Sequence, residues 1–395
     1  MKLNIGVFFG GKSTEHEISC ITANQAIQAI NKEKYNVLPI YISKNGEFYT
    51  GEALFDIANY AKCVSNPEEV LTKVCIYKDG PLVKVDPIKN IFKKTQTIDV
   101  AFNAVHGTNV EDGTLAGFLQ MLDIPYTSCD VLGGALGQDK AAMKDVFKAE
   151  DIPMVDYFVV YNSDFDANNK KYIEKAKKMK FPLIAKPANL GSSVGIEVIE
   201  SIDEFNEKIN NCLQYDFKIV VEKMIKNLKE VNISVIGNNE NARVSVIEEV
   251  TNGFLDYNKK YLPNGSKAGS KKLPNKTGKI GASKGMASTA RKIPAQLTKT
   301  QQKTIEETAL KVFRVLNANG CVRIDFMIDN KTKKVYCNEI NTIPGSLSFY
   351  LWKEVGLSFE DECDELIQNA LNRYAKRSNK TYSFDTNILE GYAKR

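Results

Sequence analysis

The sequence predicts an α/β protein of two or three domains, with parallel strands near its start and an antiparallel hairpin near its end. Residues 2–9 form an apolar stretch of strand length, followed by Gly10-Gly11 and a helical pattern, an order typical of a doubly wound sheet. Residues 320–350 contain two strand patterns joined by a turn. The 395 residues exceed what one hydrophobic core usually holds, so more than one domain is expected.

The composition is that of an ordinary globular protein, because 43% of the residues are hydrophobic and 26% are charged. The net charge of +5 comes from scattered lysine-rich stretches, which suits a small anionic substrate and gives little support for nucleic-acid binding. No apolar run approaches membrane-spanning length. The eight cysteines form no C-x-x-C pair and no secretory apolar segment is present, so we expect reduced thiols in a cytoplasmic protein.

The first part of the chain alternates strand and helix patterns. A capping box of Thr14 and Glu17 is expected to start the first helix, and a second strand is expected over residues 37–42. A third, buried strand is expected over residues 99–105. The only two histidines, His16 and His106, lie at strand ends, and we favour a structural role over proton transfer for both.

The middle of the chain carries a candidate phosphate-binding hairpin. A strand ends at Lys186, residues 188–195 are small or polar, and residues 196–199 resume a strand. Backbone N–H groups and hydroxyls of such a turn can cover phosphates, and Lys186 favours this over a plain glycine hairpin. The strand–GxxxxGK[ST]–helix arrangement of P-loops is absent. Residues 222–225 could connect two domains and present backbone groups to a base, with Glu230 near a ribose.

A long basic segment precedes the last hairpin. Residues 256–293 are rich in Lys, Gly and Ser and are long for a loop inside a compact domain. Two interpretations stay open: a lid that closes over polyphosphate, and a solvated insertion. An amphipathic helix over residues 299–316 then leads into the hairpin.

The last hairpin predicts a metal site. Arg323 and Asp325 lie on the face opposite its alternating apolar residues, and Glu339 and Asn341 are two residues apart on the return strand, so they share a face. Three oxygen ligands on one sheet face suit Mg²⁺ riding on substrate phosphates. A solvated polar face is the alternative, but the flanking apolar residues weaken it, because acids in such a setting need a partner.

Eight motifs in order resemble the D-alanine–D-alanine ligases of the ATP-grasp superfamily, including the vancomycin-resistance relatives that make D-Ala–D-Ser or D-Ala–D-lactate. The resemblance runs from residue 3 to about 370. The motifs are GGKSTEHEIS (10–19), HGTNVEDGTLAGFLQ (106–120), DK (139–140), IAKPANLGSSVGI (184–196), VVEK (220–223), DYNKKY (256–261), RIDFM (323–327) and NEINTIPG (338–345).

The resemblance implies an ATP-grasp fold, in which an N-terminal doubly wound domain (1–138) precedes two α+β domains that sandwich ATP. These two are a central domain (139–228) and a C-terminal domain (229–376) that carries the lid (256–293), and a polar tail follows (377–395). It implies a D-alanyl phosphate intermediate, D-alanine and ATP as small-molecule substrates, no nucleic-acid or membrane partner, and a homodimer.

The resemblance also assigns roles residue by residue. ATP contacts fall on Lys140, Lys186, Ser192, Ser193, Glu222, Lys223, Ile225, Glu230 and Lys260. Two Mg²⁺ ions, with Mn²⁺ as an alternative, fall on Asp325, Glu339 and Asn341. Glu15 would hold the first D-alanine's ammonium, with Ser192 and Tyr261 locking the lid over it. Arg323 and the Gly345 N–H would stabilise the oxyanion, and His106, Tyr350 and Leu351 would lie near the substrates.

Three departures from the family pattern bear on the reaction. Val110 replaces a glycine, the lid is longer and more basic, and Tyr350-Leu351 stands where typical members have Ser-Leu near the second substrate. D-Serine is therefore an alternative acceptor, whereas Tyr261 favours an amine over lactate. A different ATP-grasp carboxylate–amine ligase and a non-enzymatic nucleotide-binding regulator are the remaining alternatives; the intact Asp325, Glu339 and Asn341 set speaks against the regulator.

Overall fold

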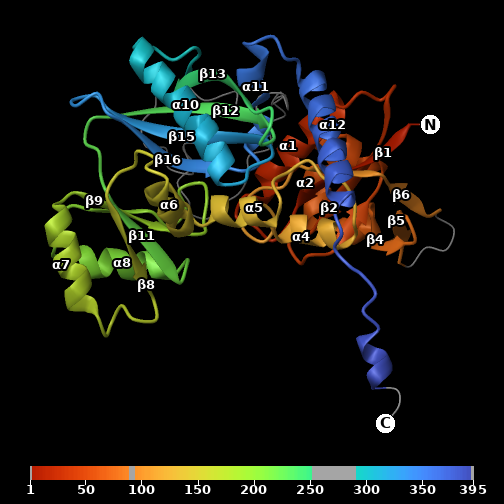
Figure 1. Ribbon diagram of the computed structural model, residues 1–395, viewed down its shortest axis with the longest axis horizontal. Helices are drawn as coiled ribbons and strands as arrows, with labels where there is room; N and C mark the ends of the chain where they lie inside the picture. Colours follow the sequence, from red (N-terminus) through yellow and green to blue (C-terminus); the bar gives the residue numbers. More distant parts are fainter. Residues whose placement is uncertain (1, 89–93, 251–290, 393–395) are drawn as a thin grey trace.

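The strands form three sheets, each built from one continuous part of the chain (Figure 1). The computed structural model describes residues 2–88, 94–250 and 291–392. The sheets have strand orders β6-β5-β4-β3-β2-β1-β7, β10-β9-β11-β8 and β14-β13-β12-β15-β16. The predicted lid residues Lys260 and Tyr261 lie outside the described residues.

The seven-stranded sheet is mixed. Its strands are β1 (Leu3–Gly10), β2 (Tyr35–Ile42), β3 (Phe48–Thr50), β4 (Thr72–Asp79), β5 (Leu82–Pro87), β6 (Gln96–Ile98) and β7 (Val100–Asn103). Only the β1–β2 and β1–β7 pairs are parallel. The expected doubly wound parallel sheet is thus correct for three strands, and the other pairs are antiparallel. The short β2–β3 link explains part of this, because a parallel crossover needs a dozen or more residues.

The helices of this part are α1 (His16–Ala29), α2 (Tyr60–Ser65), α3 (Pro67–Val70), α4 (Thr114–Met121) and α5 (Val131–Gln138), with 3₁₀ turns η1 (Glu52–Phe55) and η2 (Ile57–Asn59). The predicted capping box is wrong: Glu15 occupies the N-cap position of α1, and no side chain caps it. Instead, Ser19 Oγ accepts from the Gly10 N–H at 2.7 Å, and His16 Nδ1 lies 2.6 Å from the Gly11 carbonyl. His16 therefore holds the strand end against the helix, which agrees with its structural interpretation.

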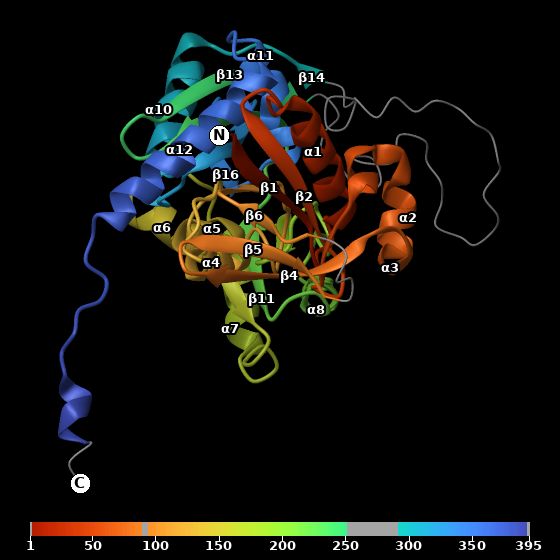
Figure 2. The ribbon, with the colours of Figure 1, turned by 90° about the vertical axis from the view of Figure 1, so that its right-hand side faces the viewer.

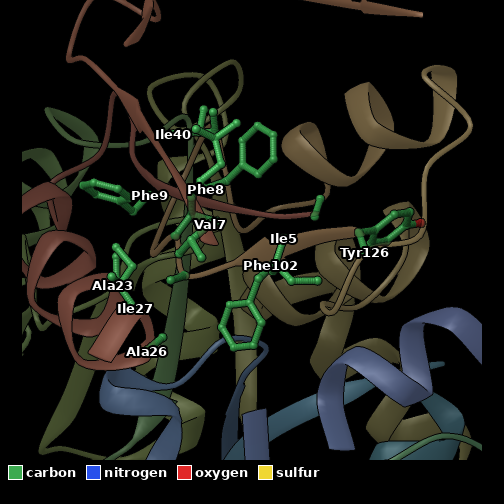
Figure 3. Close-up of a cluster of buried hydrophobic side chains, with 14 of the residues drawn as sticks. Ile5, Val7, Phe8, Phe9, Ala23, Ala26, Ile27, Ile40, Phe102 and Tyr126 are labelled. Atoms are coloured by element: carbon green, nitrogen blue, oxygen red, sulfur yellow. The ribbon is translucent and has the colours of Figure 1, made fainter. Parts of the chain in front are cut away.

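Strand β1 lies between β2 and β7 in the sheet, and its buried side chains lie beside those of α1 in the core (Figure 3). Val7, Phe8 and Phe9 are all fully buried, so both faces of the strand are covered. The C-terminal helix α12 (Phe359–Ser378) packs against α1, and its Leu366 and Ile367 join the same cluster. The end of the chain is thereby fixed to its beginning.

The four-stranded sheet is antiparallel throughout. It contains β8 (Tyr157–Tyr161), β9 (Leu183–Pro187), β10 (Glu197–Ile199) and β11 (Lys218–Lys223). Helices α7 (Asn169–Met179) and α8 (Phe205–Leu213) pack on it through Tyr172, Phe205 and Ile209. The β9–β10 pair confirms the predicted hairpin and holds the residue 188–195 loop at its tip.

The five-stranded sheet is also antiparallel. It contains β12 (Leu228–Gly237), β13 (Arg243–Val250), β14 (Arg291–Lys292), β15 (Gly320–Asp329) and β16 (Val335–Asn341). Helices α6 (Lys140–Ala149) and α10 (Lys299–Val315) cover one face. Phe147 of α6 belongs to this core, although the sequence analysis groups residues 139–149 with the central domain; the domain limits stay a prediction.

The turn η4 (Gly345–Ser348) and helix α11 (Phe349–Lys353) lead from β16 toward α12. After α12 the chain extends away from the body, ending in η5 (Ile388–Gly391) (Figures 1 and 2). Among the described residues, no helix has the length and apolar character needed to cross a membrane.

Candidate active site

The β15–β16 hairpin brings together the predicted metal ligands. Asp325 lies opposite Glu339, and Arg323 lies opposite Asn341. Arg323 donates from Nε and Nη2 to the two oxygens of Asp325 at 2.7 and 2.8 Å, and Asn341 Nδ2 donates to Asp325 Oδ2 at 3.2 Å. Burial by itself would lower the Arg323 pKa, but the carboxylate of Asp325 outweighs it and keeps the pKa raised. This cluster lines a cavity between the three sheets.

A β-bulge adds a polar residue that the sequence analysis missed. The register shifts after Asp325, so that Phe326 pairs with Cys337 and Asn338 is left between pairs. Asn338 lines the cavity next to Glu339, and its Oδ1 accepts from Lys186 Nζ at 3.2 Å. A bulge lets two successive residues face the same side, which a strict alternation cannot predict.

The two predicted phosphate lysines approach the hairpin from different elements. Lys140 begins helix α6, and its Nζ lies 2.8 Å from the Leu190 carbonyl and 3.5 Å from Glu339 Oε2. Lys186 is the penultimate residue of strand β9, and its Nζ lies 2.7 Å from Glu222 Oε2. Both line the cavity, so two cations face the carboxylates of the hairpin.

Glu222, which is predicted to contact adenine, forms buried ion pairs with two lysines. Its Oε1 lies 2.9 Å from Lys144 Nζ, and both side chains are 1% exposed. Burial alone would raise the Glu222 pKa, but Lys144 and Lys186 outweigh it and lower the pKa to about 2. The sequence analysis does not name Lys144. Its position one helical turn after Lys140, on the same helix face, is the sequence signal that could have identified it.

A second cavity adjoins the first and shares Lys186, Glu230 and Asn338 with it. Its wall includes Glu222 and the predicted hinge residues Lys223, Met224 and Ile225. Adjoining cavities suit an elongated ligand with a base at one end and phosphates at the other.

Glu15 lines the first cavity beside the β9–β10 loop. Ser192 Oγ donates to Glu15 Oε1, and Ser192 and Ser193 both adopt positive φ in the β9–β10 loop. A Cβ atom on Gly191 would lie 2.8 Å from Glu15 Oε2, and one on Gly107 would lie 2.9 Å from it. Glycines at both positions let the two loops close directly around this carboxylate.

His106 lines the cavity but is engaged on both sides. Its Nδ1 lies 2.8 Å from the Ile343 carbonyl and its Nε2 lies 2.8 Å from Thr22 Oγ1. Burial lowers the His106 pKa. A neutral ring bonded at both nitrogens agrees with a structural role beside the substrate site.

Glu111 is a cavity residue that the sequence analysis quoted only as part of a motif. It accepts hydrogen bonds from the Gly107 and Ile343 N–H groups at 2.8 Å each and from Thr342 Oγ1 at 3.0 Å. Burial, followed by the nearby Glu15, raises its pKa to about 7. Glu111 therefore joins the loop after β7 to the loop after β16. Val110, beside it, is buried and contacts the position of Gly11.

Of Gly345, Tyr350 and Leu351, which are predicted near the second substrate or the oxyanion, one lines the cavity and two lie behind its wall. Gly345 lines the cavity. Leu351 is fully buried outside the cavity wall, which makes it a core residue in this structure rather than a surface for substrate. Tyr350 also lies behind the wall, where its hydroxyl donates to Glu248 Oε1 at 2.9 Å.

Comparison with known proteins agrees with this geometry. The family model described as "D-ala D-ala ligase N-terminus" matches residues 4–129, and that described as "D-ala D-ala ligase C-terminus" matches residues 146–279 and 281–368.

The chain belongs to the D-alanine–D-alanine ligase family.

Relatives in this family match over nearly the whole chain. A D-alanine–D-alanine ligase of Thermosipho melanesiensis is 39% identical over 393 residues, which is 98% of each chain. That of Thermosipho africanus is 36% identical over 395 residues, again 98% of each. The predicted assignment to a family of ligases is thus confirmed.

Solved structures confirm the predicted ATP-grasp fold. The D-alanine–D-alanine ligase from Coxiella burnetii has a TM-score of 0.77 at 24% identity and covers 100% of this chain and 99% of its own. The VanG D-Ala:D-Ser ligase from Enterococcus faecalis has a TM-score of 0.74 at 28% identity, covering 94% and 100%. The three sheets described above are therefore the framework of an ATP-grasp fold.

Proposed function

We propose that this family member joins D-alanine to D-alanine with ATP and a divalent metal, through a D-alanyl phosphate, to supply a peptidoglycan precursor. One observation carries the proposal: a single cavity is lined by the Glu15–Ser192 contact and by the Lys140, Lys186 and Glu339 charges. It therefore has places for an amino acid's ammonium and for a transferring phosphoryl group within one enclosure.

In the first step, the carboxylate of one D-alanine attacks the γ-phosphorus of ATP, and ADP leaves. Glu15 orients the donor by pairing with its ammonium, and Ser192 in turn orients Glu15. Lys140 and Lys186 offset the negative charge that spreads over the transferring group. Their fixed positions matter most, because phosphoryl transfer depends mainly on positioning and electrostatics.

The hairpin residues fit a metal that is bound together with substrate phosphates. Among the described residues, no group of three or more His, Cys, Asp or Glu side chains could hold an ion unaided. Asp325, Glu339 and Asn341 instead offer two carboxylates and an amide oxygen, the partial donor set typical of Mg²⁺ in phosphate-transfer sites. When bound there, the ion neutralises phosphate charge. The two-ion stoichiometry belongs to the proposal.

In the second step, the amine of the acceptor attacks the acyl carbon and phosphate leaves. Arg323 and the Gly345 N–H lie on the wall of the cavity and can donate to the developing oxyanion. Removing one such donor typically costs about 3–4 kcal/mol in the barrier. The predicted lock of Tyr261 over Glu15 belongs to the proposal as well.

The test is an assay with ATP, Mg²⁺ and single or paired D-amino acids. D-Alanine-dependent ADP release and a D-alanyl-D-alanine product identified by mass would support the proposal. Absence of D-alanine-dependent ADP release would refute it, and bicarbonate-dependent phosphate release would point to a different carboxylate–amine ligase.

A second candidate keeps the chemistry and uses D-serine as the acceptor. Two observations favour it: Tyr350-Leu351 replaces the usual Ser-Leu, and a D-Ala:D-Ser ligase is among the solved structures that resemble this chain. A higher kcat/KM for D-serine than for D-alanine as acceptor would decide for it. The cytoplasmic setting and the homodimer are part of the same proposal, and light scattering of the purified protein tests the dimer.

A further inference from the structure

One wall of the main cavity carries a row of polar side chains across four strands. Glu248 on β13 pairs in register with Asn232 on β12, Asn232 pairs with Asp325 on β15, and Asp325 pairs with Glu339 on β16. Directly opposite residues of antiparallel strands point to the same face. All four line the cavity. The row therefore leads from the predicted metal ligands to a second polar group that the proposed function leaves without a role.

That second group is centred on Arg291, which begins β14. Arg291 Nη1 lies 2.8 Å from Glu248 Oε2, and its side chain is 9% exposed. The guanidinium lies over the Tyr350 ring, 4.4 Å from the ring centre, and the Tyr350 hydroxyl donates to Glu248 Oε1 at 2.9 Å. Two side chains, from β13 and α11, thus fix the guanidinium at the cavity wall.

Arg291 has the properties of a residue that binds the carboxylate of a ligand. A guanidinium carries five N–H donors in a planar fork, so Arg291 can hold Glu248 and also pair with an anion in the cavity. The other arginine of the wall, Arg323, is held by two hydrogen bonds to Asp325 and has the oxyanion role in the proposed function. The neighbouring Lys292 lines the adjoining cavity and not this one.

Asn232 supplies an independent observation beside it. Its side chain is 5% exposed, and its Oδ1 has no hydrogen-bond partner among the described residues. An unpaired buried oxygen is costly, so it marks a place where a ligand donor fits. Asn232 and Glu248 lie on adjacent strands, roughly 5 Å apart between backbones. An α-amino acid carries its amine and carboxylate on one carbon and can reach both.

Resting on the proposed ligase function, we propose that Arg291 and Asn232 form the acceptor subsite. Arg291 binds the α-carboxylate of the acceptor, and Asn232 Oδ1 accepts from its amine. Glu248 and Tyr350 are positioning residues that hold the guanidinium. This arrangement places the amine on the Asp325 side of the acceptor, toward Arg323 and the donor. It also gives Tyr350 a role behind the wall instead of a direct substrate contact.

The experiment is a competition between two acceptors in one reaction. D-Alanine and D-alaninamide are supplied at equal concentration with ATP and Mg²⁺, and the ratio of the two products is measured by mass. D-Alaninamide lacks the carboxylate and serves only as an acceptor. The product ratio reports the ratio of kcat/KM values, so changes in donor binding, ATP binding or the folded fraction cancel.

In the Arg291→Gln variant, the preference for D-alanine over D-alaninamide is expected to fall roughly 10- to 100-fold, the range for losing a charged hydrogen bond. Asn232→Ala is expected to lower kcat/KM for both acceptors alike and leave their ratio unchanged. Arg291→Lys, which keeps the charge, is expected to lower the ratio less than Arg291→Gln, and it carries the test if Arg291→Gln yields no product.

Arg243→Gln is the matched control. Arg243 lies on β13, the strand that pairs with β14. Like Arg291, it pairs with a glutamate (Glu365, at 2.6 Å) and lies over an aromatic ring (that of Trp352), but it does not line the cavity. Its product ratio should equal that of the wild type. An unchanged ratio in both Arg291 variants would overturn the subsite. Absence of any dipeptide from the wild-type protein would instead refute the proposed function.

Discussion

Replacing Glu222 by Gln is expected to destabilise the four-stranded sheet together with the two buried lysines that pair with Glu222. The Glu222 carboxylate lies 2.9 Å from Lys144 Nζ and 2.7 Å from Lys186 Nζ, with side-chain exposures of 1%, 1% and 7% for the three residues. The amide removes the negative charge that lies next to both buried ammonium groups. Breaking a buried pair in this way costs about 3–5 kcal/mol.

The pKa of Glu222 gives a second measure of the same interaction. The lysines lower it from 4.5 to about 2, and a shift of about 2.5 pKa units corresponds to roughly 3 kcal/mol. Because the folded-state pKa lies below the unfolded value, this stabilisation is present above pH 4.5 and is lost as the pH falls toward 2. This free energy agrees with the cost of about 3–5 kcal/mol expected for breaking the buried pair.

Hydrogen exchange of peptides from β9 and β11 measures the local effect. At neutral pH, the Glu222→Gln variant should exchange about 100-fold faster there, since each tenfold corresponds to about 1.4 kcal/mol. In urea titrations, the difference in unfolding free energy between wild type and variant should shrink below pH 4.5.

Glu197→Gln is the control within the same sheet. Its ion pair with Lys208 is about a quarter exposed, at 25% and 28%, so a loss below about 1 kcal/mol is expected. Equal effects of the two substitutions would show that burial does not strengthen the Glu222 pairs, and the reasoning would fail.

Three further predictions concern the cavity. Glu339→Ala should abolish Mg²⁺-dependent ADP release while circular dichroism shows a folded protein; near wild-type turnover would sink the metal assignment. Glu111 has a pKa raised from 4.5 to about 7, so wild-type stability should fall by roughly 3 kcal/mol as the pH rises from 4.5 to 7, and Glu111→Gln should remove this slope in melting temperature. Ser192→Ala releases Glu15 and should lower kcat/KM roughly 10- to 100-fold without changing the melting temperature; an unchanged kcat/KM would exclude a role for this contact.

Local sequence patterns predicted the features that are formed by a single hairpin or a single turn. The two-residue period along β15 and β16 placed Asp325, Glu339 and Asn341 on one face, and the small residues after Lys186 predicted the hairpin loop. Patterns of this kind failed where a helix start depended on its neighbours. Thr14 and Glu17 resemble a capping box, but Glu15 is turned into the cavity and Ser19 and His16 bond the strand end instead.

The sequence by itself determined the family and which residues of the last hairpin face one way, because alternation and turn chemistry act over a few residues. Only the tertiary structure decided that Lys144 shares Glu222 with Lys186, and that Arg291 rests on Tyr350 and Glu248 at the end of the polar row. These contacts join residues 36 to 78 positions apart. Their partners are set by how whole elements pack, which no local period contains.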